Sequence, residues 1–356
     1  MPSDTRGPQA FESVITAAPD KVAEFAEEKS VVQRFQHMLH QTPALVPLIV
    51  LVVSTIIFGV ILGSKFFSAY ALTLIIRQVA ITGIVGAAQT LVVLTAGIEL
   101  SVGAIMVLSS VLMGQMVFRY GMPPAVGVVA GLMLGAAIGF LNGNLVARMK
   151  LPPFIVTLGM WQIVLATNFI YSGNETIRAQ DIQDKAPLLQ VFGNTVEIGG
   201  AVLTWGAIFM LALVLFMAYV LRHTAWGRHV YAVGDDPDAA ELAGVKVKAT
   251  LVGVYTIAGL ICAMAGWVLI GRLGSVSPQS GQFENINSIT AVVIGGISLF
   301  GGRGSILGMM FGALIVGVFT LGLNMYGTDP QWTYLLIGVL IIAAVAVDQW
   351  IRKAAA

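Results

Sequence analysis

Few side chains within the apolar stretches of this chain can do chemistry, and most of those are amides and hydroxyls. Such groups donate and accept hydrogen bonds without requiring a counter-charge, which suits the hydroxyl groups of a neutral polyol. Their alternative role is to hold helices together by interhelical hydrogen bonds. The candidates for solute contact along a translocation path are Glu99, Ser101, Asn142, Asn144, Gln162, Asn168, Asn287 and Arg303.

Residues suited to metal binding or nucleophilic catalysis are scarce. The four histidines are His37, His40, His223 and His229, and none pairs with another at helical spacing within an apolar run. The single cysteine, Cys262, lies in an apolar run and can form no disulfide within the chain. The sequence contains no G-x-x-x-x-G-K-[ST] phosphate loop. We therefore expect no metal, no cofactor and no catalytic residues, and the energy for any active transport must come from another protein.

The composition is that of a membrane protein. Hydrophobic residues make up 57% of the 356 residues and charged residues only 10%, whereas a soluble domain carries about 25% charged residues. A bilayer needs about 20 apolar residues per helix. The apolar runs predict an all-α polytopic membrane protein with about ten transmembrane helices, at residues 44–63, 71–96, 102–118, 123–147, 154–171, 201–221, 250–270, 288–300, 306–323 and 332–351. The net charge of +1 gives no reason to expect a nucleic-acid partner.

Lysine and arginine residues indicate the orientation, since cytoplasmic loops carry the excess. With the amino end inside, the inner loops and tail hold Arg148, Lys150, Arg222, Arg228, Lys246, Lys248, Arg303, Arg352 and Lys353, and the outer loops hold only Lys65, Arg119, Arg178, Lys185 and Arg272. We therefore expect both termini in the cytoplasm, a periplasmic loop at residues 172–200 and a cytoplasmic loop at residues 222–249.

The expected domain organisation is simple. Residues 44–353 form a single transmembrane domain. Residues 1–43 form a cytoplasmic tail that lacks a cleavable signal. This tail is either an amphipathic helix lying on the membrane surface or loosely ordered chain.

Two glycine-flanked segments interrupt the helical pattern. Residues 95–103 place Glu99 between apolar runs, and residues 295–305 overlap and follow a predicted span, 288–300, that is too short for about 30 Å of hydrocarbon. Both predict discontinuous or re-entrant helices beside a translocation path. The alternative is a tight cytoplasmic turn at each place, with Glu99 and Arg303 at the headgroup level, where a charge costs less. Arg77 is the other charged residue expected at membrane depth.

Glycines also recur at helical spacing within the predicted spans. Small residues at such spacing let helix backbones approach closely. Close helix contacts are therefore expected at Gly131, Gly135, Gly139, Gly308, Gly312 and Gly317.

A polar segment at residues 222–248 separates two apolar spans. Asp236 can cap a helix that has Pro237 at its first position and stops at Gly244. Isolated helices under about 12 residues are marginal in water, so this short helix must pack against something. It either lies on the inner surface of this protein or inserts into a groove on a cytoplasmic motor as a coupling helix.

Four motifs together resemble the permease subunits of bacterial ABC importers for monosaccharides, the ribose-type family. They are TAGIELSVGAIMVLSS at residues 95–110, NGNLVARMKLPPFIVTLGM at residues 142–160, GRHVYAVGDDPDAAELAGVKV at residues 227–247 and AVVIGGISLFGGRGSILGMMFGALIVG at residues 291–317. The resemblance covers nearly the whole chain after the tail. The chain has Asp235 where relatives commonly have Gly or Asn, and Glu99 where an Asp is common, which retains the carboxylate.

The resemblance implies the ABC importer permease fold, a place in the bacterial inner membrane and transport by alternating access. The implied partners are a cytoplasmic ABC ATPase, a periplasmic sugar-binding protein, a second permease copy in a homodimeric or pseudo-dimeric pore, and the membrane lipid. The segment expected to dock the ATPase comprises Gly234, Asp235, Asp236, Pro237, Ala239, Ala240 and Gly244. Among sugars the resemblance is closest to permeases for fructose or ribose, with fructose favoured.

Three other functions remain open at this point. A permease of similar architecture for branched-chain amino acids or an autoinducer would be distinguished by the ligand that its binding protein retains. An ion-coupled secondary transporter would need more buried ionisable residues than this chain offers. A membrane-embedded enzyme would need a nucleophile with a base or a pair of metal ligands at suitable spacing, which the sequence lacks.

Overall fold

The computed structural model describes residues 44–353 apart from residue 282. The predicted tail, residues 1–43, lies outside the described residues. The first part of the chain forms α3 (Leu45–Leu62), η1 (Gly63–Lys65), α4 (Ala69–Leu94), α5 (Val102–Phe118), α6 (Pro124–Ala147), α7 (Pro153–Ser172), α8 (Ala179–Lys185), η2 (Pro187–Gly193), β1 (Thr195–Ile198) and β2 (Ala201–Thr204). The second part forms α9 (Trp205–His223), α10 (Ala225–Asp235), α11 (Pro237–Leu242), α12 (Val247–Leu273), α13 (Glu284–Ile294), α14 (Ile306–Tyr326) and α15 (Pro330–Lys353).

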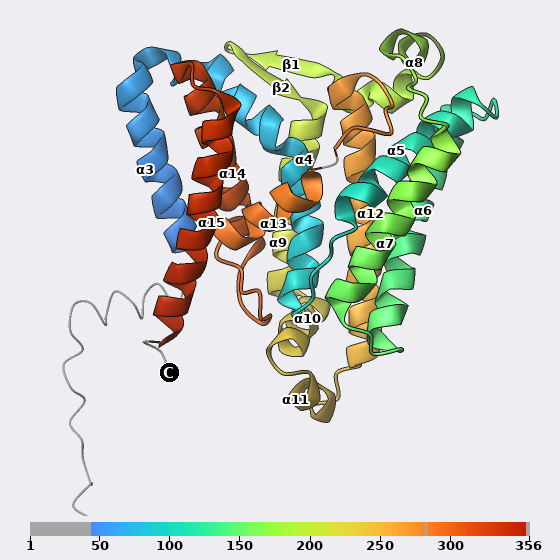
Figure 1. The fold of residues 1–356 in the computed structure, drawn as a ribbon, viewed down its shortest axis with the longest axis vertical. Helices are drawn as coiled ribbons and strands as arrows, with labels where there is room; N and C mark the ends of the chain where they lie inside the picture. The colour runs from blue at the N-terminus through green and yellow to red at the C-terminus, as the bar shows by residue number, and fades with distance from the viewer. Residues whose placement is uncertain (1–43, 282, 354–356) are drawn as a thin grey trace, which may run out of the picture.

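The long helices lie side by side with their axes broadly parallel (Figure 1). Each of the ten predicted spans overlaps a helix. Within the described residues, seven helices are long and apolar enough to cross a membrane by length and composition: α3 with η1, α4, α6, α7, α9, α12 and α14. α5 and a part of α15 are shorter apolar helices. The prediction of an all-α polytopic membrane protein is confirmed.

Two predicted spans differ from the helices observed. The span predicted at residues 201–221 begins with β2, because β1 and β2 pair as an antiparallel hairpin with Thr195 opposite Thr204. α9 starts only at Trp205, where the Thr204 hydroxyl accepts a hydrogen bond from the Ala207 amide and caps the helix. The span predicted at residues 288–300 is displaced, because α13 begins at Glu284 and ends at Ile294. An irregular segment at residues 295–305 then joins α13 to α14.

α4 passes through the centre of the molecule. Every residue from Val79 to Leu94 is buried, because α4 packs against α9, α12, α13 and α14. A second, smaller core lies between α3, the start of α4 and the end of α14, and consists of Phe58, Phe66, Ala71, Ile75, Val318 and Leu321. The central helix therefore contacts both groups of helices, those around α12 and those around α3.

Glycines bring two helix pairs to backbone contact. A methyl group at Gly259 of α12 would overlap the carbonyl oxygen of Gly135 in α6. In the same way, a methyl group at Gly312 of α14 would overlap the carbonyl oxygen of Ala291 in α13. The predicted close helix contacts at Gly135 and Gly312 are confirmed, and any larger side chain there would push the helices apart.

Candidate coupling segment and translocation path

The polar segment between α9 and α12 folds into two short helices, α10 and α11, which lie at the same end of the molecule as the C-terminal end of α15 (Figure 1). The Thr224 hydroxyl accepts from the Gly227 amide at 3.1 Å and caps α10, a helix that the sequence analysis did not predict. Asp236 accepts from the amides of Asp238 and Ala239 at 3.0 Å and caps α11. The predicted Asp236 cap is therefore confirmed.

α11 makes little contact with the rest of this chain. Among its six residues, all of which are described, Ala240 alone is buried. Gly244 follows with φ +85°, a conformation that glycine adopts without strain. Leu242, absent from the predicted docking set, is 91% exposed. The sequence feature that could have identified Leu242 is a large apolar side chain on a short polar helix. An exposed apolar residue of this kind is typical of a contact with another protein.

The end of α10 meets both predicted helix interruptions. The Gly302 amide donates to the Leu94 carbonyl at 3.0 Å, which joins the segment at residues 295–305 to the end of α4. Gly234 packs between the same two residues, because a methyl group there would overlap the Leu94 oxygen and lie 2.8 Å from the Gly302 nitrogen. The Tyr231 hydroxyl donates to the Gly304 carbonyl at 2.9 Å. Burial raises the pKa of this phenol, so it remains a donor at neutral pH. We call these five residues the junction.

The chain between α4 and α5 places Glu99 and Ser101 beside Asn142 of α6. Glu99 is only 3% exposed, so its carboxylate is buried within the protein. Its carboxylate accepts from the Ser101 amide at 2.8 Å, from the Ser101 hydroxyl, and from the Asn142 amide group at 2.9 Å. Thr157 of α7 donates to the Ile98 carbonyl at 2.9 Å. These bonds anchor residues 95–101 to α6 and α7.

The other predicted path residues lie apart from this cluster. Asn168 is buried, donates to the Pro278 carbonyl at 2.8 Å and lines a cavity of about 170 Å³ between α5, α7 and α13. Asn287 lines a different cavity, described below. Asn144 donates to the Phe140 carbonyl of its own helix, whereas Gln162 and Arg303 are exposed. The predicted path residues therefore lie at several separate places in the structure and do not form one site.

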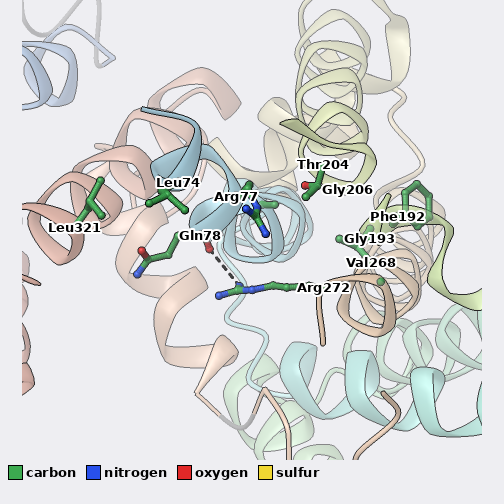
Figure 2. A pocket seen from close by; sticks show the side chains of 12 residues that line it. Leu74, Arg77, Gln78, Phe192, Gly193, Thr204, Gly206, Val268, Arg272 and Leu321 are labelled. Atoms are coloured by element: carbon green, nitrogen blue, oxygen red, sulfur yellow. Dashed lines mark hydrogen bonds between the residues drawn. The ribbon is translucent and has the colours of Figure 1, made fainter. Parts of the chain in front are cut away.

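Two larger polar cavities are both lined by residues of α4, α12 and α14. One, of about 280 Å³, is lined from α4 by Arg77 and from α12 by Arg272, with η2 and β2 at its edge (Figure 2). The second, of about 300 Å³, lies between α4, α12, α13, α14 and α15. Both are lined by Gln78 and Arg272. Arg272, predicted in an outer loop, therefore lies in the last turn of α12 and reaches a cavity.

Comparison with known proteins places these features in a family. The family model described as "Branched-chain amino acid transport system / permease component" matches residues 71–345. The fructose import permease protein FrcC of Rhizobium meliloti is 70% identical over 349 residues, which cover 98% of this chain and 97% of the relative. The ribose import permease protein RbsC of Bacillus subtilis is 35% identical, over 81% of this chain and 88% of the relative.

A more distant curated relative transports a different sugar. The D-allose transport system permease protein AlsC of Escherichia coli is 32% identical, over 85% of this chain and 91% of the relative. No solved structure matches the chain. The sugar named therefore varies among relatives that match most of the chain.

Proposed function

The chain belongs to the permease family of ABC importers, as a monosaccharide import permease of the inner membrane, and from this membership we propose that its cargo is fructose. The observation that carries this proposal is the 70% identity to a fructose import permease over nearly the full length of both chains. Identity to the ribose and D-allose permeases is about half as high, 35% and 32%. The chain is a transport subunit and not an enzyme, so ATP is hydrolysed by its partner.

Uptake of labelled sugars tests the proposed cargo. A strain that lacks this gene, with its binding protein and ATPase intact, would be compared with the same strain after the gene is restored. We expect restoration to recover fructose uptake and to leave ribose, D-allose and leucine uptake unchanged. Leucine serves as the control for the amino-acid cargo that the family description names. Recovery of another solute without fructose would contradict the proposal.

An ABC importer permease works with an ATPase and a substrate-binding protein, and we infer that α10 and α11 form the ATPase docking segment. Three observations support this inference. α11 is exposed on all sides except at Ala240, Leu242 is largely exposed on it, and α10 contributes Tyr231 and Gly234 to the junction. A partner that moves α11 would thereby move residues bonded to α4 and to the segment at residues 295–305.

We further infer that both chain ends and residues 222–249 face the cytoplasm, whereas residues 172–200 face the periplasm. The support is that α11 and the end of α15 lie at one end of the molecule, and α8 and the β1–β2 hairpin at the other (Figure 1). Residues 44–353 act as one transmembrane domain that meets a second copy and the surrounding lipid. Two differently tagged copies should therefore co-purify. In an Asp184→Cys variant, a thiol reagent that cannot cross the membrane should label position 184 only when it is added from the periplasmic side.

We infer that Glu99 acts on transport by anchoring residues 95–101 rather than by binding the sugar. The support is that its carboxylate is buried and accepts three hydrogen bonds from Ser101 and Asn142, and that residues 95–101 follow Leu94, which belongs to the junction. Direct contact with sugar is the alternative. A Glu99 variant that alters the preference between sugars, and not only the rate, would favour that alternative.

A further inference from the structure

The cavity of about 300 Å³ between α4, α12, α13, α14 and α15 combines polar side chains from all five helices. They include Thr82, Arg272, Glu284, Asn287, Thr320 and Asn324. We call this cavity the outer chamber. Of these residues, Asn287 was predicted to line the translocation path, whereas Arg272 and Glu284 were not.

Glu284 lies at the centre of the polar contacts in the outer chamber. Its carboxylate accepts from the Thr82 hydroxyl of α4 at 3.0 Å and from the Asn287 amide group of α13 at 3.3 Å. Arg272, from the last turn of α12, lines the same chamber and donates to the Gln78 carbonyl at 3.3 Å. A carboxylate offers about four acceptor positions and a guanidinium five donors. Both groups therefore retain capacity for a ligand beyond these bonds.

Charged side chains among apolar helices are costly, and in membrane proteins they face a water-filled cavity or one another. Glu284 lines the outer chamber and is bonded to Thr82 and Asn287. An apolar residue at position 284 could pack α13 against α4 without this cost. Glu284 is therefore better explained by something that the outer chamber accommodates than by helix packing alone.

The donors and acceptors define the class of ligand. A guanidinium donates, a carboxylate accepts, and the hydroxyl of Thr320 and the amide of Asn324 can do both. Sugar hydroxyls also donate and accept, so they can satisfy this mixture without a net charge. A bound anion would be repelled by the Glu284 carboxylate, and a bound cation would be repelled by the Arg272 guanidinium. The volume lies at the lower end of the range for ligand pockets, about 300–1,000 Å³, which suits a single small molecule.

The outer chamber lies far from the docking segment. Arg272 is in the last turn of α12, whereas α11 precedes the first turn of the same helix. Twenty-seven residues of α helix span about 40 Å. The adjoining cavity, which shares Gln78 and Arg272, is bordered by η2 and β2, on the side inferred to face the periplasm.

We propose that the outer chamber is a binding site for one monosaccharide molecule during import, with Glu284 and Arg272 as the groups that bind its hydroxyls. This inference rests on the proposed function, since it assumes a sugar as cargo. The site is a transient one, because a sugar must leave it to reach the cytoplasm. Through this site, the permease itself contributes to the selection of the sugar.

The first test measures uptake by the complete importer in proteoliposomes. Glu284→Gln and Thr82→Val should lower the maximal rate of fructose uptake on the order of tenfold, the effect of losing one hydrogen bond to a charged group. ATP hydrolysis stimulated by the loaded binding protein should stay within about twofold of the unmodified importer, since the docking segment is untouched. The matched controls are Glu197→Gln on β1 and Thr167→Val on α7, both exposed and outside the chamber, and they should transport normally.

The second test avoids changing the charged groups. In a Cys262→Ala background, Thr320→Cys places one thiol in the outer chamber, and Glu197→Cys places one outside it. A small hydrophilic methanethiosulfonate reagent should label both. Saturating fructose should slow labelling at position 320 several-fold, leucine should not, and neither should affect position 197.

The outcomes separate this inference from the proposed cargo. If the unmodified importer takes up no fructose, the proposed function fails and the inference fails with it. If the unmodified importer takes up fructose but both charge and hydroxyl variants transport normally, and fructose gives no protection at position 320, the inference alone is overturned.

Discussion

The phenol of Tyr231 donates a hydrogen bond to the carbonyl oxygen of Gly304, 73 residues later in the chain, at 2.9 Å. This bond ties α10 to the segment between α13 and α14. The same segment donates from the Gly302 amide to Leu94 at the end of α4. α10, the first helix of the docking segment, is thus connected by two successive hydrogen bonds to the central helix α4.

Replacing Tyr231 by Phe should weaken the connection between ATP hydrolysis and sugar movement. The ring still fills its space, but one hydrogen bond worth about 1 kcal/mol is lost. We expect fewer sugar molecules to be transported per ATP hydrolysed, with the ATPase still bound. The control is Tyr219→Phe, since Tyr219 is exposed on α9 and its ring lies tilted against that of His223. An unchanged ratio of sugar to ATP in the Tyr231 variant would remove the junction from the proposed mechanism.

Gly234→Ala should be far more damaging than its size suggests. A methyl group at this position would overlap the Leu94 carbonyl oxygen, which is backbone and cannot move aside alone. The end of α10 must therefore shift away from α4, and we expect uptake to fall by at least about tenfold, equivalent to about 1.4 kcal/mol. Gly159→Ala is the matched control, because open space surrounds Gly159. Equal uptake by the two variants would show that the close approach is unimportant.

Leu242→Ala should weaken binding of the ATPase. Leu242 is 91% exposed in the described chain, and burial of a leucine side chain in an interface contributes about 1.5–3 kcal/mol. We expect a loss of affinity on the order of tenfold or more, measured with the purified permease in detergent. Ile198→Ala on β1, also an exposed aliphatic side chain, should bind the ATPase with unchanged affinity. Identical affinities for both variants would place the docking surface elsewhere.

Ala240→Pro should disrupt α11 itself. The Ala240 amide donates to the Asp236 carbonyl at 3.0 Å, and proline removes this donor, at a cost of about 3 kcal/mol in a helix interior. We expect normal insertion into the membrane but loss of the co-purifying ATPase and of sugar uptake. Gly244→Glu should act in the same direction, because residue 244 has φ +85°. Normal sugar uptake with the ATPase still co-purifying would contradict the docking proposal.

Glu99→Ala should reduce the stability of the folded permease as well as transport. It leaves buried donors of Ser101 and Asn142 without their acceptor, and each such group costs about 1–3 kcal/mol. Thermal unfolding of the purified importer would measure this loss. Glu175→Ala, at an exposed carboxylate, is the control. Because Glu99 and Asn142 are in contact, the Glu99→Ala/Asn142→Ala pair should be less destabilised than the sum of the single variants, and strict additivity would contradict the anchoring role.

Much of the fold could be predicted because long apolar runs determine where helices form. The start of α11 could also be predicted, since an aspartate followed by proline caps a helix by local geometry. The hairpin of β1 and β2 was missed because β2 is apolar at Ala201, Val202 and Leu203, like the helix that follows, and β1 lies in the predicted periplasmic loop. α10 was missed because its polar residues are typical of a loop, and its buried positions, such as Val230 and Val233, depend on contacts with distant helices.

The candidate site was less predictable, because it depends on which helices become neighbours. Local sequence singled out Glu99 and Asn142 separately, but only the fold shows that they are hydrogen bonded to each other. Glu284 gave no local signal at all. Its partner Thr82 lies 202 residues away, and Arg272 was read as an outer-loop charge until the extent of α12 was known. Pairings of this kind are tertiary and cannot be read from composition or spacing.

The glycine contact between α6 and α12 restricts how the two helices can move. With the backbone of Gly259 against that of Gly135, sliding of one helix along the other would force main-chain atoms into overlap. We therefore expect α6 and α12 to rotate together as one rigid unit. α12 begins just after α11 and spans about 40 Å, so a rotation of about 5° at the docking end would displace its far end by about 3.5 Å. A small angular input at the ATPase would then become a displacement of Arg272 large enough to change the width of the cavities that it lines.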